Sequence, residues 1–465
     1  MLTKSETFKQ EYCCTVVKIG EVQPIENSDF LAQVLVEGRT IVIRKDQVHE
    51  GDLMFYVSNE CQVNADFLHH GNYYEEKTMN ADPEKKGYIN KYGRIRMVKL
   101  RGVLSMGILF GLAEIQRWCP NMQGFDMEKH VGEDFDTIDG QLFVKAYVPL
   151  RKEPRQHSAG KHKKQRPRFD RIIPTEFTFH YETQQLNREI DRLHPDDEVS
   201  ISVKLHGTSL VMGNILTLKP RWGGLYARVF PSLPKWLQFT KEDYDVIYSS
   251  RTVIKNKYYE TKHDEETDVW GEYYQLLKDY IPKGYTIYGE IVGYVGGLAQ
   301  MIQKGYDYGC NEGENRLMIY RVSVAENGRH RELNIPEVQA FIEETRRKMD
   351  SNITQGTTGR PLSYRLMDIP LLYEGRIGDL YPDIADSENW NAELLEHLKQ
   401  DSANMAMEKN EPLCKNKVPR EGICIRIMND PVNECFKLKT LTFLGKEAEL
   451  IDKGEIDMEL QETGE

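Results

Sequence analysis

No part of this 465-residue sequence is apolar over the roughly 18 residues that a membrane-spanning helix needs. The nearest approach, residues 284–297, contains Glu290 and several glycines. The opening residues, MLTKSETFKQ, are polar and do not have the apolar middle part of a signal peptide. We therefore expect a cytoplasmic protein that does not enter the membrane.

Cysteine occurs 8 times, but never in a C-x-x-C pair. The adjacent Cys13 and Cys14 suit neither a mutual disulfide nor a zinc site, so we expect reduced thiols. The pattern G-x-x-x-x-G-K-[ST] is also missing, which excludes P-loop kinases and helicases. No internal repeat of roughly 20–50 residues is visible.

The balance of charge is acidic, with 61 Lys plus Arg against 73 Asp plus Glu and a net charge of −12. This argues against a protein that coats nucleic acid by bulk charge. The charge is unevenly spread, however. Nine cations face only Glu153 and Asp170 between Arg151 and Arg171, whereas the last twenty residues are strongly acidic. We therefore predict four parts: a domain over 1–150, a basic linker over 151–175, a domain over 176–446 and an acidic tail over 447–465.

Short runs rich in Val, Ile and aromatic residues alternate with turn signals before the linker and predict a small β-barrel. They cover residues 14–19, 31–36, 40–44, 53–57, 94–100 and 105–110. A polar excursion is expected at 64–92. Arg94, Arg96, Lys99 and Arg101 give the barrel a basic strand, which we expect to contact nucleic-acid phosphates.

The second domain has mixed patterns, so we predict an α+β protein overall. Helices are expected at 182–193, 266–280, 335–349 and 391–405, the last with Ser387 as N-cap candidate. Strands are expected at 199–204, 210–214, 245–249, 285–292, 316–322, 422–428 and 435–439. Residues 219–236 are crowded with Gly, Pro and Trp and are expected to form an extended loop or hairpin.

Charged side chains interrupt several apolar strands of this domain. Lys204 ends a strand just before a glycine turn, where desolvation and nearby cations would lower its pKa and make it a nucleophile. Glu290 and Glu421 lie in or beside apolar strands, and Lys437 and Lys439 share one strand face. Two lysines and two glutamates on strands indicate a polyphosphate beside a divalent metal.

These elements occur in a recognisable order: Lys204-x-His206-Gly207, Glu290, Tyr320, Glu421-Gly422 and Lys437-x-Lys439. The order resembles the signature of the covalent nucleotidyltransferases, which comprise ATP-dependent DNA and RNA ligases and mRNA capping enzymes. The short motifs KLHGTS and YGEIVG are most similar to the corresponding motifs of RNA ligases. Residues 15–38, 46–57 and 94–110 resemble the OB-like module that precedes the ligase domain in the fifth RNA-ligase family. The resemblance covers about 14–110 and 199–443.

The resemblance assigns a role to each motif residue. Lys204 matches the lysine that attacks the α-phosphate of ATP and becomes lysyl-AMP, and Lys437 and Lys439 match the pair that contacts this phosphate. Tyr320 matches the aromatic residue that stacks on adenine, and Arg251 the arginine near the sugar and phosphates.

The remaining motif residues concern the turn and the metal. Glu290 matches a glutamate that binds ribose or metal-bound water, and Glu421 a second glutamate that orients metal-bound water. His206 and Gly207 belong to the same nucleotide site, but His206 stands where many relatives have aspartate. The cofactors implied are ATP and a divalent metal, Mg²⁺ or Mn²⁺.

The family implies an ATP-dependent RNA ligase with an N-terminal OB-like barrel and an antiparallel-sheet nucleotidyltransferase domain. It would join 3′-hydroxyl and 5′-phosphate ends through lysyl-AMP and RNA-adenylate intermediates. Its partner would be RNA ends or a nicked duplex, including an RNA–DNA hybrid. A DNA ligase, a capping guanylyltransferase and a non-catalytic nucleic-acid-binding protein with a degenerate ligase domain are the alternatives.

Overall fold

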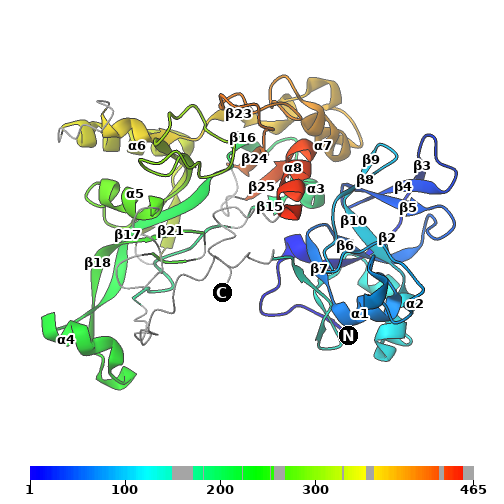
Figure 1. The fold of residues 1–465 in the computed structure, drawn as a ribbon. Helices are drawn as coiled ribbons and strands as arrows, with labels where there is room; N and C mark the ends of the chain where they lie inside the picture. The colour runs from blue at the N-terminus through cyan, green and yellow to red at the C-terminus, as the bar shows by residue number, and fades with distance from the viewer. Residues whose placement is uncertain are drawn as a thin grey trace. The chain divides into compact units, whose positions relative to one another are not determined.

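The structure, a computed structural model, describes residues 1–148, 171–181, 183–222, 224–251, 253–255, 268–326, 329–351, 361–428 and 434–453 (Figure 1). It divides into two compact units. The first comprises Met1–Leu150 with Glu447–Asp452, and the second Arg151–Lys446 with Lys453–Glu465. Most of the expected basic linker and the end of the expected acidic tail lie outside the described residues.

The first unit consists of short antiparallel strands. Its elements are β1 (Leu2–Thr3), β2 (Cys14–Lys18), β3 (Val22–Pro24), β4 (Leu31–Val36), β5 (Arg39–Arg44), β6 (Leu53–Ser58), β7 (Cys61–Val63), α1 (Ala65–Gly71), β8 (Val98–Leu100), β9 (Val103–Ser105), β10 (Gly107–Phe110), α2 (Leu112–Trp118), β11 (Asp134–Phe135), β12 (Thr137–Ile138), β13 (Gln141–Leu142) and β14 (Val144–Ala146). A sheet of order β10-β6-β2-β11 and the β3-β4-β5 meander form most of it. All six expected runs contain strands.

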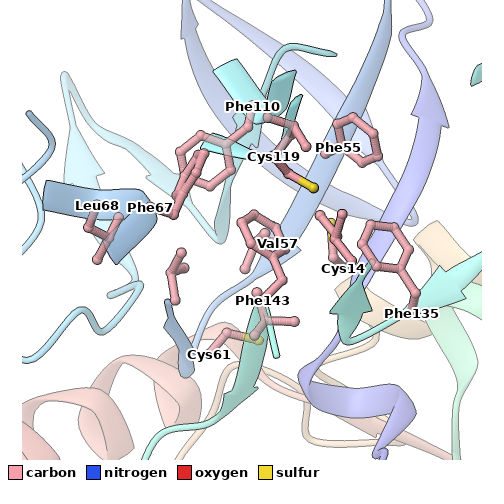
Figure 2. Packing of buried hydrophobic residues seen from close by; sticks show 14 of the residues in the cluster. Cys14, Phe55, Val57, Cys61, Phe67, Leu68, Phe110, Cys119, Phe135 and Phe143 are labelled. Carbon is pink, nitrogen blue, oxygen red and sulfur yellow. The ribbon is translucent and has the colours of Figure 1, made fainter. Parts of the chain in front are cut away.

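The larger core of this unit is rich in aromatic residues (Figure 2). Phe67 meets Phe110 edge to face with ring centroids 5.0 Å apart, and Phe55 meets Phe135 in the same way at 5.8 Å. Phe67 lies on α1, whose N-cap Asn64 accepts the amides of Asp66 and Phe67. The expected excursion at 64–92 therefore contributes a helix and buried side chains to the core.

The second unit contains two larger sheets. Its strands are β15 (Gln184–Gln185), β16 (Glu198–Lys204), β17 (Thr208–Pro220), β18 (Thr240–Ser249), β19 (Tyr285–Gly293), β20 (Asn315–Glu326), β21 (Arg329–Glu332), β22 (Leu366–Asp368), β23 (Leu371–Arg376), β24 (Gly422–Ile427) and β25 (Cys435–Lys439). One sheet has the order β15-β25-β24-β16-β23, and the other β18-β17-β19-β20-β21 with β22 beside β20. Every expected strand is present, and β17 and β18 extend well beyond their expected ends.

The second unit has six helices in the described residues. They are α3 (Leu186–Glu189), α4 (Gly224–Val229), α5 (Val269–Leu277), α6 (Ile335–Ser351), α7 (Trp390–Gln400) and α8 (Leu441–Asp452), whose last residues belong to the first unit. Of these, α5, α6 and α7 contribute side chains to the cores of the sheets. The N-cap of α7 is Asn389, so the expectation for Ser387 is wrong. The Ser387 hydroxyl instead accepts the Asn389 amide and donates to Glu393.

Two expectations about the whole chain concern cysteine and the membrane. All eight cysteines lie in the described part of the chain, and none of them is in a disulfide. Within the described ranges, no helix has the length and apolar character to cross a bilayer.

Candidate active site

One face of the first sheet of the second unit carries the three lysines of the motifs. The register pairs Lys204 with Gly422 and Gly422 with Lys439, which places both lysines in one row across β16, β24 and β25. Alternate residues of a strand point to opposite faces. Ile201, Ile423 and Phe436 pack in a hydrophobic core on the other face. Lys437 follows Phe436 and therefore lies on the face of Lys204 and Lys439.

Glu421 is the anion at the centre of this group. Its Oε1 lies 2.7 Å from Nζ of Lys204 and 3.6 Å from Nζ of Lys439, and its Oε2 lies 3.7 Å from Nδ1 of His206. The Glu421 residue is only 3% exposed. Burial alone would raise the pKa of its carboxyl, but Lys204, Lys439 and His206 together hold that pKa below its usual range. Glu421 is therefore a buried anion at neutral pH.

The same ion pair corrects the expectation for Lys204. Burial lowers the pKa of its amine and Lys439 lowers it further, but Glu421 outweighs both, so the pKa of Lys204 lies above its ordinary value. Lys204 is consequently a protonated ammonium in this structure. Before it can act as a nucleophile it must lose both its proton and this interaction with Glu421.

A second buried ion pair lies next to Glu421 in the chain and fixes the backbone there. The neighbouring Arg420 donates from Nε and Nη2 to the two carboxylate oxygens of Glu411, each at 2.9 Å, and from Nη1 to Met405 O at 2.8 Å. The side chains of Arg420 and Glu411 are 3% and 0% exposed. The Arg420 carbonyl accepts the Thr440 hydroxyl at 2.6 Å. These bonds fix the backbone at the entrance to β24, where Glu421 lies.

Gly207 and Glu290 connect the turn after β16 to the second sheet. The Gly207 amide donates to Oε1 of Glu290 at 3.0 Å, and its carbonyl accepts Nε2 of Gln303 at 2.7 Å. A Cβ at position 207 would stand 2.3 Å from the Ile291 carbonyl oxygen, so only glycine fits here. The turn therefore holds the first lysine and the first glutamate of the motifs close together.

His206 lies in an aromatic surrounding. Its ring meets those of Tyr306 and Phe443 edge to face, with centroids 4.9 and 5.0 Å away. Its amide donates to the Tyr308 hydroxyl at 2.7 Å. The imidazole thus takes an apolar place beside Glu421, where a carboxylate would repel that anion.

Tyr320 lies on β20 next to a histidine that the motifs did not reveal. The Tyr320 hydroxyl and Nδ1 of His180 are hydrogen-bonded 3.2 Å apart. Burial lowers the pKa of His180 to about 3, helped by the positive charges of Arg251, Lys204, Arg321 and Lys437. The positive charges of Arg251 and Lys437 therefore reach the same histidine as the charge of Lys204. Nothing in the local sequence FTFHY distinguishes His180 as a site residue.

Arg321 and Arg426 are two further cations that the sequence did not indicate. Arg426 donates from Nη2 to Tyr320 O at 2.8 Å. Arg321 lies 3.3 Å from Oε1 of Glu332 and 4.1 Å over the ring of Tyr181. One cation from each sheet, Arg426 on β24 and Arg321 on β20, thus lies next to Tyr320 in space or in the chain.

The neutral state of His180 predicts acid sensitivity. The unfolded chain binds a proton at a histidine pKa of about 6.5, whereas the folded protein keeps His180 neutral to about pH 3. The unfolded state therefore binds more protons between these values, and stability falls as the pH falls through this window. From pH 7.5 to pH 5, His180 should cost about 2 kcal/mol of unfolding free energy. Between these two pH values, the H180N variant should lose about 2 kcal/mol less unfolding free energy than the wild type, as measured by urea unfolding. Equal losses in both proteins would contradict the assignment of a neutral His180.

The basic strand of the first unit is only partly available. Arg94 is 3% exposed, with Nε 2.7 Å from Oε2 of Glu60 and Nη1 2.5 Å from Oδ1 of Asp452. This corrects the expectation for Arg94, whose guanidinium is used inside its own unit. Arg96 is half-buried and bonded to Glu75 at 2.9 Å, whereas Lys99 and Arg101 are exposed. Lys99 and Arg101 are therefore the residues of this strand that we propose to contact phosphates, and Arg96 lies near them in the chain.

The fold and the site define a class: an OB-fold domain followed by a mixed-sheet, nucleotidyltransferase-like domain with three lysines and a buried glutamate on one sheet face. A family model described as RNA ligase matches residues 197–439, just over half of the chain, and a model described as an OB-fold domain matches residues 13–112. The chain belongs to the RNA ligase family. The resemblance found in the sequence and the expected fold class are thereby confirmed.

Solved structures agree with this placement. An RNA ligase mutant of Naegleria gruberi with ATP and Mn has a TM-score of 0.55 at 13% identity and covers 94% of this chain and 99% of its own. The same ligase with PPi has a TM-score of 0.54 at 14% identity, covering 95% and 100%. A mutant with AMP and Mn has a TM-score of 0.53 at 16% identity, covering 94% and 99%. The fold is thus shared over nearly the full length. No curated protein matches this chain.

Proposed function

We propose that this protein is an ATP-dependent RNA ligase that joins a 3′-hydroxyl to a 5′-phosphate through lysyl-AMP and RNA-adenylate intermediates. The observation that carries the proposal is the ammonium of Lys204, 2.7 Å from the buried Glu421 and in one row with Lys439. A row of amines on a sheet face, in a member of the RNA ligase family, suits attack on a nucleotide phosphate. The relatives with ATP, AMP and PPi support the choice of nucleotide.

In the first step, the deprotonated Nζ of Lys204 attacks the α-phosphorus of ATP. A P–N bond forms, the bond to the β-phosphate oxygen breaks, and pyrophosphate leaves. Lys437 and Lys439, on the same sheet face as Lys204, supply fixed positive charge for the charge that develops on the α-phosphate. The Tyr320 ring offers a flat surface for adenine, with His180 bonded to its hydroxyl.

Two further transfers complete the reaction. An oxygen of the RNA 5′-phosphate attacks the phosphorus of lysyl-AMP, the P–N bond breaks, and Lys204 regains a proton. The RNA 3′-hydroxyl then attacks the activated 5′-phosphate, loses its proton, and AMP leaves as the phosphodiester bond forms. Lys204 is thus regenerated, and its ion pair with Glu421 can form again.

The acidic residues fit a metal that is held jointly with the nucleotide. In the described ranges, no group of three or more His, Cys, Asp or Glu side chains is arranged to hold a metal ion alone. Mg²⁺ and similar ions bind through one or two carboxylates together with substrate phosphates. Glu421, kept anionic by its cations, and Glu290 would be these carboxylates. Mg²⁺ or Mn²⁺ would neutralise charge on the phosphates when bound, as the relatives with Mn suggest.

The substrate is proposed to be RNA ends or a nicked duplex, including an RNA–DNA hybrid. Lys99 and Arg101 of the OB-fold domain are exposed and would contact phosphates. A cytoplasmic location was expected from the sequence and stays a prediction.

The test combines nucleotide transfer with nick sealing. The wild-type protein, given a divalent metal and α-labelled ATP, should acquire acid-labile, alkali-stable label, as expected of a lysine phosphoramidate. It should then seal nicked duplexes with RNA on the 3′-hydroxyl side. Label from GTP but not ATP would instead identify a capping guanylyltransferase, and preference for DNA at the 3′-hydroxyl would identify a DNA ligase. Absence of any label would indicate a non-catalytic protein.

A further inference from the structure

The longest hairpin of the second unit ends in a structured tip. Strands β17 and β18 pair from Val211–Ser249 out to Pro220–Thr240. Beyond the last pair, the described residues 221–222 and 224–239 include α4 and two short 3₁₀ turns, and we call these residues the hairpin tip. Figure 1 shows α4 at the end of the extended β17 and β18 strands. The tip overlaps residues 219–236, which were expected to form an extended loop or hairpin.

Internal bonds give the hairpin tip a defined shape. Phe230 is fully buried and lies 5.5 Å from the Tyr226 ring. The Tyr226 hydroxyl donates to Leu237 O at 2.8 Å and accepts the Phe239 amide at 3.2 Å. Nε2 of Gln238 donates to Leu233 O at 2.8 Å. Tyr226 and Phe230 therefore form a small core, and the other aromatic residues of the tip are not needed for it.

Those other aromatic residues face solvent. Trp222 is 62% exposed, Trp236 77% and Phe239 52%. The sequence has 5 tryptophans, and Trp270 and Trp390 are buried while Trp118 is half-buried. All five tryptophans lie in the described residues, and the two that are exposed are both in the hairpin tip. Large flat side chains left in water at one place indicate a surface that another molecule covers.

The charge of the tip indicates what kind of molecule that is. Residues 221–239 contain Arg221, Arg228 and Lys235 and no Asp or Glu, although the whole chain has a net charge of −12. At the base of the tip, Lys219 and Lys241 share Asp243, with Nζ atoms 3.4 and 3.6 Å from its Oδ2. A cationic tip on an acidic protein is complementary to a polyanion.

We propose that the hairpin tip binds single-stranded RNA, whose bases stack on Trp222, Trp236 and Phe239 while Arg221 contacts the phosphates. Exposed aromatic rings interleaved with cations are the surface that binds single strands, because every base offers a π face. The choice of RNA as polyanion rests on the proposed function. Leu225 and Val229 on α4 are also exposed, so an anionic membrane is the rival that the test must separate.

The position of the tip makes the contact depend on substrate length. β17 begins at Thr208, directly after Gly207 of the active site, and has 13 residues. At about 3.3 Å per residue, the tip lies roughly 40 Å along the strand from Gly207. An RNA that reaches both places must extend well beyond its reacting end. Long single strands should therefore gain affinity from the tip, and short ones should not.

The experiment compares the full-length wild type with the variant W222A/W236A/F239A. Binding is measured with fluorescein-labelled single-stranded RNA of about 3 and about 30 nucleotides, below and above the usual site size of roughly 4–16 nucleotides. The variant should bind the long RNA at least about tenfold more weakly and the short RNA equally. Wild-type tryptophan fluorescence should be quenched by the long RNA. W222F/W236F keeps flat rings and should retain most of the affinity. R221S removes one phosphate contact, so the slope of log K against log[salt] should become less steep by about 0.7.

Folding of the alanine variant is checked by transfer of labelled AMP from ATP to Lys204, which needs no RNA. If AMP transfer occurs and the variant binds long RNA like the wild type, the tip proposal is overturned while the proposed function stands. If the wild type forms no lysyl-AMP but the variant loses RNA binding, the proposed function fails and the tip stands. Wild-type binding to vesicles containing anionic lipid that the variant loses, with unchanged RNA binding, would identify a membrane contact instead.

Discussion

Replacing Lys204 by alanine is expected to abolish transfer of labelled AMP from ATP to the protein, with a loss of more than about a thousandfold. The reason is covalent: the alanine side chain has no atom that can form the P–N bond, and the amines of Lys437 and Lys439 belong to a different strand. The measurement is acid-labile, alkali-stable label on the protein after incubation with α-labelled ATP and a divalent metal. Sealing of RNA that already carries a 5′-adenylate should be affected much less, because that step does not use the free amine.

Two further variants separate the nucleophile from its charge. K204R keeps the positive charge beside Glu421 but cannot lose its proton in the working range, so it should be as inactive as K204A. K348A removes an exposed lysine of α6 that is paired with Glu344, and it should transfer AMP like the wild type. Persistent alkali-stable label on K204A would show that another residue is the nucleophile.

The strands of both units could be predicted from the sequence because their local pattern is sufficient. The bounds of β4 and β25 agree with the expected 31–36 and 435–439, since β4 is a mostly apolar run before a turn and β25 alternates apolar residues with Lys437 and Lys439. The hairpin tip could not be predicted in this way. Its Gly, Pro and Trp residues are typical of loops, and α4 is stabilised by the bonds of Tyr226 to Leu237 and Phe239, which no periodicity reveals.

The site residues could be listed from motifs, but their electrostatics could not. The expectation for the pKa of Lys204 counted desolvation and cations, whereas the deciding partner, Glu421, is 217 residues away in the chain. His180 shows the same limit of local sequence patterns, because it lies in the site although no motif indicates it. Its place among Arg251, Lys204 and Arg321 results from sheet packing, and a histidine among aromatic residues gives no local signal.

The expectation for Arg94 in the basic strand of the first unit was wrong for a similar reason. A run with alternating cations predicts a charged face, but Arg94 finds Glu60 and Asp452 from distant segments and becomes buried. Among the described residues, Lys99 and Arg101 have no such carboxylate partners and remain exposed. Sequence patterns thus identify which side chains carry charge, and only the packing decides which of them face solvent.

Removing the partner of a buried charge should produce the second large effect. E411A leaves the guanidinium of Arg420 buried without its carboxylate, and breaking such a pair costs about 3–5 kcal/mol of unfolding free energy. Urea unfolding followed by tryptophan fluorescence measures this, because four of the five tryptophans lie in the second unit. E344A removes the exposed partner of Lys348 on α6 and should cost less than about 1 kcal/mol.

The double variant E411M/R420M distinguishes the cost of an orphaned charge from the value of the pair. Two apolar side chains of suitable length bury no charge, so this variant should be more stable than E411A although it has lost more polar contacts. AMP transfer should nevertheless stay below the wild-type level in E411M/R420M, because the bonds of Arg420 fix the backbone that presents Glu421 to Lys204. Stability and activity would then recover to different extents in one protein. Equal stability of E411A and the wild type would contradict the buried pair, and full activity of the double variant would show that Glu421 does not depend on it.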